Sequence, residues 1–165
     1  MTQRILFLFN HDAAHQAAHI AGIAGHLAVH APQVRVVVAS GTEAIRRTVA
    51  AIIPEAAHAH IEWVTLTMPD WAARWLKPLN TVAPVFRLAR LRYNEDLFSG
   101  VDLLVSTERT CLRVKQRLGT RSPRFVYVPH GSGDRNVAYH PDLARFDLML
   151  LSGQKLVDEM FRHGI

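Results

Sequence analysis

The sequence predicts an α/β fold, a Rossmann-like parallel sheet of about six strands with helices on both faces. Three observations support this fold class. Short apolar runs alternate with helix-length segments along the 165 residues. The runs are apolar enough to be covered on both faces, as strands of parallel sheets are. Polar or glycine residues follow most runs, where such sheets bind ligands.

In the first half of the chain, strands are expected at residues 4–10, 34–40 and 60–68, and helices at residues 12–31 and 42–53. Pro32 and Pro54 each stop a helix, since proline cannot continue the helical hydrogen bonds. Thr42 is a candidate N-cap for the second helix.

In the second half, strands are expected at 101–107, 124–131 and 146–153, and helices at 109–119 and 154–165. Residues 69–99 interrupt this alternation, because Pro69, Pro78 and Pro84 divide any helix there into pieces.

Length and composition fit one Rossmann-like domain over residues 1–165, with 49% hydrophobic and 20% charged residues. The single cysteine, Cys111, permits no intramolecular disulfide, and the apolar run near the N-terminus is too short for a signal peptide or membrane span. A cytoplasmic protein is expected, with peripheral contact at the inner face of the membrane left open.

All of the excess positive charge, a net +5, lies after residue 69. It suggests an anionic partner such as a phosphate-bearing ligand or lipid headgroups, although an ordinary basic bias explains it equally well. Residues 71–78 and 86–93 interleave aromatics with arginines. Packing of the aromatics is the favoured interpretation, and a lip within residues 70–93 that meets a membrane surface is the alternative. No nucleic-acid-binding module is recognisable, and no nucleic-acid partner is expected.

The usual Rossmann cofactor signatures are missing. NHDAAHQA replaces a glycine fingerprint after the first strand, and no Walker A loop occurs, so a nicotinamide dehydrogenase or P-loop NTPase is disfavoured and no cofactor is expected. Ligand residues are instead expected after the strands, within Asn10–His15, Ser40–Thr42, Thr107–Arg109, His130–Arg135 and Ser152–Lys155.

The first helix carries histidines on one narrow stripe, at positions 15, 19, 26 and 30. Their i,i+4 spacing could chelate a metal, but no carboxylate shares the stripe. An exposed helix edge is the favoured interpretation, and no metal site is predicted.

The stretch YVPHGSGDR, residues 127–135, is the most informative. Gly131 and Gly133 permit close backbone approach to an anionic group, and His130 can accept a proton near neutral pH. Asp134 could orient that histidine and Arg135 could hold phosphate. The alternative is a turn in which His130 satisfies backbone groups.

After VPHGSGDR come Tyr139 and then RFDLMLLSGQKLVDEMFRHG, residues 145–164. Together these segments resemble glycosyltransferases of the two-domain GT-B type, and most closely the CDP-glycerol glycerophosphotransferase (teichoic-acid polymerase-like) family. The residues that carry the resemblance are His130, Gly131, Tyr139, Phe146, Asp147, Ser152 and Gly153. The resemblance is firmest over residues 124–164. The family usually has an aromatic residue just before His-Gly, whereas this chain has Pro129, so transfer of a sugar remains possible as well as transfer of glycerophosphate.

The resemblance implies the N-terminal, acceptor-side half of a two-domain enzyme of cell-envelope polysaccharide synthesis. A nucleotide-activated sugar or glycerol donor would bind through a second domain, and His130 would activate a hydroxyl acceptor with Asp134 assisting. The expected substrate-binding residues are His11, Asp12, Gly131, Ser132, Gly133, Arg135, Ser152 and Lys155. Half of a nucleotide-sugar 2-epimerase and a non-catalytic lipid- or partner-binding domain remain alternatives.

Overall fold

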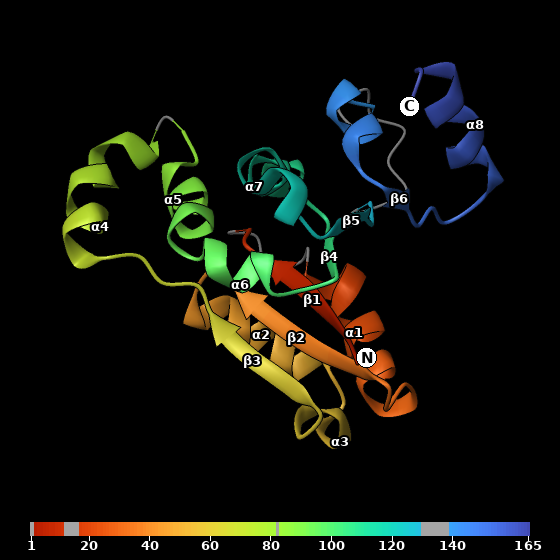
Figure 1. Cartoon of the computed structure of the whole chain (residues 1–165), viewed down its shortest axis with the longest axis horizontal. Helices are drawn as coiled ribbons and strands as arrows, with labels where there is room; N and C mark the ends of the chain where they lie inside the picture. The colour runs from red at the N-terminus through yellow and green to blue at the C-terminus, as the bar shows by residue number, and fades with distance from the viewer. Residues whose placement is uncertain (1, 12–16, 82, 130–138) are drawn as a thin grey trace.

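The computed structural model describes residues 2–11, 17–81, 83–129 and 139–165. Within these residues, six strands form one parallel sheet in the order β3-β2-β1-β4-β5-β6 (Figure 1). The strands are β1 (Gln3–Phe9), β2 (Val34–Ser40), β3 (Ile61–Thr65), β4 (Leu103–Ser106), β5 (Arg124–Tyr127) and β6 (Leu148–Met149). The predicted Rossmann-like class is confirmed.

Helices form the crossover connections between the first five strands, while between β5 and β6 the described residues contain only a short 3₁₀ segment. In the described residues the helices are α1 (Ala18–His30), α2 (Glu43–Ile52), α3 (Glu55–His58), α4 (Asp70–Leu76), α5 (Val85–Tyr93), α6 (Glu95–Ser99), α7 (Leu112–Leu118) and α8 (Gln154–Arg162). Short 3₁₀ segments are η2 (Lys77–Thr81), η3 (Arg109–Cys111), η4 (Gly119–Arg121) and η6 (Pro141–Arg145). The interrupted region is thus several helices, and Pro69 and Pro84 directly precede α4 and α5.

Alternating side chains of β1 fill two apolar cores, one on each face of the sheet. Phe7 and its i±2 neighbours pack with α1 and α2, while Leu6 and Leu8 pack with α5, α6 and α7. Figure 1 shows α1–α3 on one side of the strands and α5–α7 on the other. This two-sided burial explains why β1 and β2 are almost continuously apolar.

The strand expected at 146–153 is much shorter than predicted. Only Leu148 and Met149 pair with β5, and β6 has no neighbour on its other side within the described chain. Leu148 and Leu150 are 54% and 43% exposed, so the apolar run is not the interior strand that its composition suggests. The predicted helix at 109–119 is also divided, into η3 and α7.

None of the helices in the described part of the chain combines the length and apolar character needed to cross a bilayer.

Candidate functional site

The strand order reverses at β1, which pairs with β2 on one side and β4 on the other. In open parallel sheets this switch point is where ligands bind, outside the carboxyl ends of the strands. Asn10 and His11 follow β1 there, and Thr107 follows β4. Ser40 ends β2 in register with Phe9, so all four residues meet at one edge.

This edge holds every buried polar or charged side chain that the described residues contain. We call the set the edge cluster, and its members are Asn10, His11, Ser40, Arg90, Ser106 and Thr107. Five of them are no more than 1% exposed, and Arg90 is 9% exposed. Because burying polar groups costs free energy unless they are bonded, their concentration at the switch point marks the candidate site.

Three oxygen atoms of the edge cluster find no hydrogen-bond partner among the described residues. They are Asn10 Oδ1, Ser40 Oγ and Thr107 Oγ1. Each such buried atom costs about 1–3 kcal/mol relative to a bonded one. A ligand with hydroxyl groups could supply the missing bonds.

Asn10 is fixed from both sides. Its Nδ2 donates to the carbonyl oxygen of Arg87 on α5 at 2.9 Å. On the other side lies Gly41, whose amide donates to the Phe9 carbonyl at 2.8 Å. A Cβ at position 41 would lie 2.8 Å from Asn10 Oδ1 and 3.1 Å from Arg90 Nη1, so only glycine leaves room for both side chains.

An ionic network supports the β4 side of the edge cluster. Arg87 Nη1 donates to Glu108 Oε1 at 3.0 Å, and Thr110 Oγ1 donates to Glu108 Oε2 at 2.8 Å. The Glu108 amide donates to Ser106 Oγ at 3.0 Å, which fixes the turn after β4. The Glu108 side chain is only 10% exposed, so this ion pair is well sheltered from water.

Most of the predicted site residues lie outside the described residues. These are both predicted catalytic residues and most of the substrate-binding set, namely His130, Asp134, Asp12, Gly131, Ser132, Gly133 and Arg135. The described chain does reach Pro129 at the carboxyl end of β5, which pairs with β4. His11 and Pro129 therefore stand at the ends of strands separated by two spacings, about 10 Å.

The remaining predicted site residues lie in two places. His11 belongs to the edge cluster and meets the Phe9 ring edge-on, with centroids 6.3 Å apart. Ser152 and Lys155 are exposed beside the start of α8, beyond β6. Since β6 stands three spacings from β1, roughly 14 Å, the structure does not bring these two residues to the edge cluster.

Two residues that carry the family resemblance have structural contacts here. Phe146 packs against the rings of Phe125 and Tyr127. Asp147 accepts from Lys115 Nζ at 2.8 Å and from the Phe125 amide at 2.7 Å. Burial acts to raise the pKa of Asp147, but these hydrogen bonds and the nearby cations outweigh it and lower the pKa. Asp147 thus joins β5, α7 and β6.

Sequence reasoning did not place Arg87 and Arg90 at the candidate site, because it considered them only as arginines that snorkel beside packed aromatics or, alternatively, face a membrane. Arg87 pairs with Glu108, and Arg90 is buried beside Asn10 and Gly41. A three-residue spacing puts Arg87 and Arg90 on one face of a helix, whereas Arg92 lies on the opposite face. The shared helix face of Arg87 and Arg90 could have been read from the sequence only if residues 85–93 had been predicted as one continuous helix.

Other reactive groups in the described residues are poor candidates for catalysis. Burial raises the pKa of the Cys111 thiol to about 12, so it stays protonated and unreactive. Burial likewise raises the pKa of Tyr127. His19, His26 and His30 are exposed on α1, as predicted for a helix edge. Across the described ranges, no three metal-ligating side chains gather into a site.

No family model matches this chain, and no curated protein matches it either. Function is therefore inferred from the residues at the carboxyl edge of the sheet.

Proposed function

We propose that this chain is the acceptor-binding domain of a glycosyltransferase or glycerophosphotransferase that uses a nucleotide-activated donor, with His130 as the catalytic base. One observation carries the proposal. The buried oxygen atoms of Asn10, Ser40 and Thr107, which lack partners in the described chain, all lie at the carboxyl ends of strands at or next to the switch point of a Rossmann-like sheet.

These groups suit a polyhydroxylated acceptor. The Asn10 carbonyl oxygen accepts hydrogen bonds, and the Ser40 and Thr107 hydroxyls can donate or accept them. The guanidinium of Arg90, beside Asn10, adds positive charge suited to an acceptor that carries phosphate. A nicotinamide or flavin cofactor would instead call for a glycine fingerprint, which the sequence lacks after β1.

The position of β5 supports the role proposed for His130. Pro129 lies at the same edge of the sheet as the edge cluster, and His130 is the next residue in the sequence. In the proposed reaction, His130 removes the acceptor's hydroxyl proton as that oxygen attacks. The new bond forms to the anomeric carbon of a sugar donor, or to the β-phosphorus of CDP-glycerol, and the nucleotide leaves with its bonding electrons.

Titration calorimetry tests the acceptor assignment, with glycerol 3-phosphate as the probe. In Thr107→Val, the dissociation constant should rise about two- to twelve-fold, the value of one hydrogen bond. The protein should not become less stable, because the lost hydroxyl has no partner within the described residues. Thr120→Val, on the exposed η4, is the matched control and should bind as the wild type does.

Two results would contradict the proposal. Equal binding of the probe by the wild type and Thr107→Val would show that Thr107 of the edge cluster does not contact the acceptor. Tight binding of CDP-glycerol or UDP-glucose to this chain alone would make it the nucleotide-binding half instead.

A further inference from the structure

Large aromatic side chains lie exposed on α4 and α5, where packing was the favoured prediction. Trp71 and Trp75, one turn apart on α4, are 60% and 78% exposed. Tyr93 on α5 is 44% exposed and meets the Trp71 ring edge-on, with centroids 6.3 Å apart. Leu79 on η2 is 51% exposed. An apolar patch of this kind marks an interaction surface.

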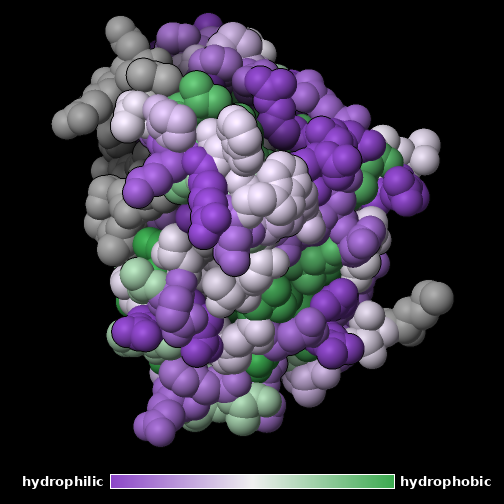
Figure 2. All heavy atoms as spheres, turned by 90° about the vertical axis from the view of Figure 1, so that its left-hand side faces the viewer, coloured by the Kyte–Doolittle hydropathy of each residue, from purple (hydrophilic) through white to green (hydrophobic). Residues whose placement is uncertain are grey.

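Positive charge surrounds this patch. Residues 70–93 contain five Lys and Arg against one acid, Asp70. Arg74 and Lys77 are exposed next to the tryptophans, and the Arg92 side chain is 57% exposed. Figure 2 looks onto this side of the molecule and shows pale and green surface between purple, charged side chains.

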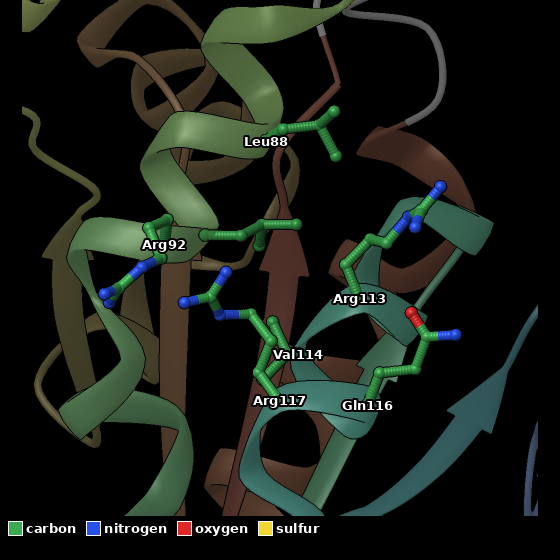
Figure 3. A pocket seen from close by; sticks show the side chains of 7 residues that line it. Leu88, Arg92, Arg113, Val114, Gln116 and Arg117 are labelled. Carbon is green, nitrogen blue, oxygen red and sulfur yellow. The ribbon is translucent and has the colours of Figure 1, made fainter.

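A groove of about 440 Å³ lies between α5, which also carries Tyr93, and α7 (Figure 3). Its floor is apolar, formed by Leu88, Leu91 and Val114, and its rim carries Arg92, Arg113 and Arg117. Arg92 donates to Glu95 at 3.1 Å and Arg117 pairs with the same carboxylate. Three guanidiniums against one carboxylate leave the groove positive, above a floor that suits hydrocarbon.

We propose that α4, η2 and α5 bind the surface of an anionic phospholipid bilayer, with Trp71 and Trp75 in the headgroup region and the groove holding a lipid phosphate. Tryptophan and tyrosine favour this interfacial region, and exposed Lys and Arg are drawn to anionic headgroups. Figure 1 shows α4 at the outer end of the molecule, projecting away from the sheet. A protruding helix suits insertion between headgroups. The inference does not depend on the proposed transfer reaction.

Vesicle sedimentation tests the proposal, with 30% phosphatidylglycerol in phosphatidylcholine compared with pure phosphatidylcholine. The wild type should sediment with the anionic vesicles and lose binding as salt is raised. Its tryptophan emission should shift to the blue. Trp71→Ser with Trp75→Ser should weaken binding at least ten-fold and remove the shift, since only half-buried Trp63 remains. Both tryptophans are exposed, so thermal unfolding should stay within about 2 °C of the wild type.

Charge is tested by a matched pair of double variants. Arg92→Gln with Arg113→Gln should weaken binding to anionic vesicles roughly ten- to thirty-fold, the effect of two basic residues near a charged surface. Arg121→Gln with Arg124→Gln removes the same charge from exposed positions at the end of η4 and the start of β5 and should change binding little. Phe161→Ser, which removes a 75% exposed ring on α8, controls for general hydrophobicity.

Three outcomes would overturn the proposal. One is an absence of binding to anionic vesicles at any lipid concentration. Another is an equal loss of binding in the control variants. The third is concentration-dependent doubling of the mass in solution that the tryptophan double variant abolishes, since the patch would then join two copies of the chain.

Discussion

At the scale of single residues, Gly41 decides how the edge cluster is packed. The end of β2 passes so close to Asn10 and Arg90 that a methyl group has no room. Asn10 would have to rotate, and its bond to the Arg87 carbonyl would then be lost. The glycine is therefore explained by close packing rather than by an unusual backbone conformation, since positive φ occurs elsewhere in the described chain, at Gly119 and Gly164.

Gly41→Ala should lower the free energy of unfolding by about 1–3 kcal/mol, as overpacked sites do. Gly22→Ala is the matched control, because nothing lies within 4 Å of a Cβ at this position on α1. That substitution should instead stabilise the protein by about 0.5–1 kcal/mol, since alanine favours the helix interior. Urea unfolding of both variants tests the pair, and equal effects would show that the close approach at Gly41 is absent.

The residues of the site were only partly predictable from the sequence. Asn10, Ser40 and Thr107 follow or end predicted strands, and the rule for parallel sheets brings such positions together. Nothing in a single sequence distinguishes Thr107 from an ordinary turn residue, because its hydroxyl becomes unusual only when burial leaves it without a partner. Arg90 comes from a helix far along the chain, so its approach to Gly41 depends on tertiary packing.

At the scale of secondary-structure elements, local signals predicted the start of α2 well. Thr42 is its N-cap, as expected, and Thr42 Oγ1 accepts a hydrogen bond from the Ile45 amide at 3.2 Å. Thr48 lies within the same helix, where its hydroxyl donates to the Ala44 carbonyl at 3.1 Å. The two threonines thus allow a comparison of one residue type in two roles.

Thr42→Ala should lower the free energy of unfolding by about 1 kcal/mol, because the Ile45 amide loses its acceptor. Thr48→Ala should be neutral or stabilising by a few tenths of a kcal/mol, since alanine has the higher helix propensity. Thermal or urea unfolding measures both. A larger loss for Thr48→Ala than for Thr42→Ala would contradict the capping role.

The sequence predicted where strands occur better than it predicted how long they are. Residues 146–153 read as a full strand from composition, yet only Leu148 and Met149 pair. Apolar content predicts burial, whereas pairing depends on whether a neighbouring strand extends far enough. β5 ends at Tyr127 and offers β6 few partners, so the rest of the run leaves the sheet.

At the scale of the whole molecule, Asp147 links three elements of the C-terminal half. Its carboxylate bonds Lys115 of α7 and the amide of Phe125 on β5, while Asp147 itself precedes β6. The side chain is 38% exposed, so solvent screening reduces the worth of the ion pair. The hydrogen bonds nevertheless lower its pKa, and this couples the stability of the fold to pH.

Asp147→Asn should reduce the free energy of unfolding by about 1 kcal/mol at pH 7. A carboxyl whose pKa is lowered by folding stabilises the protein above its unfolded pKa, about 3.9, and loses that effect as pH falls toward the folded value. The difference from the wild type should therefore shrink between pH 5 and pH 3. Urea unfolding across this range measures it, with exposed Asp158→Asn as the control. A difference that stays constant with pH would contradict the assignment.

The strand order also determines when each strand can find its partners during synthesis on the ribosome. β1 can pair with β2 soon after both emerge, but its other partner, β4, begins at Leu103, 38 residues after β3 ends at Thr65. At about 5–20 residues per second, that gap lasts roughly 2–8 s. Throughout it, one edge of the apolar central strand is open to pairing with other nascent chains. Conditions that slow elongation between residues 66 and 102 should therefore favour aggregation over folding.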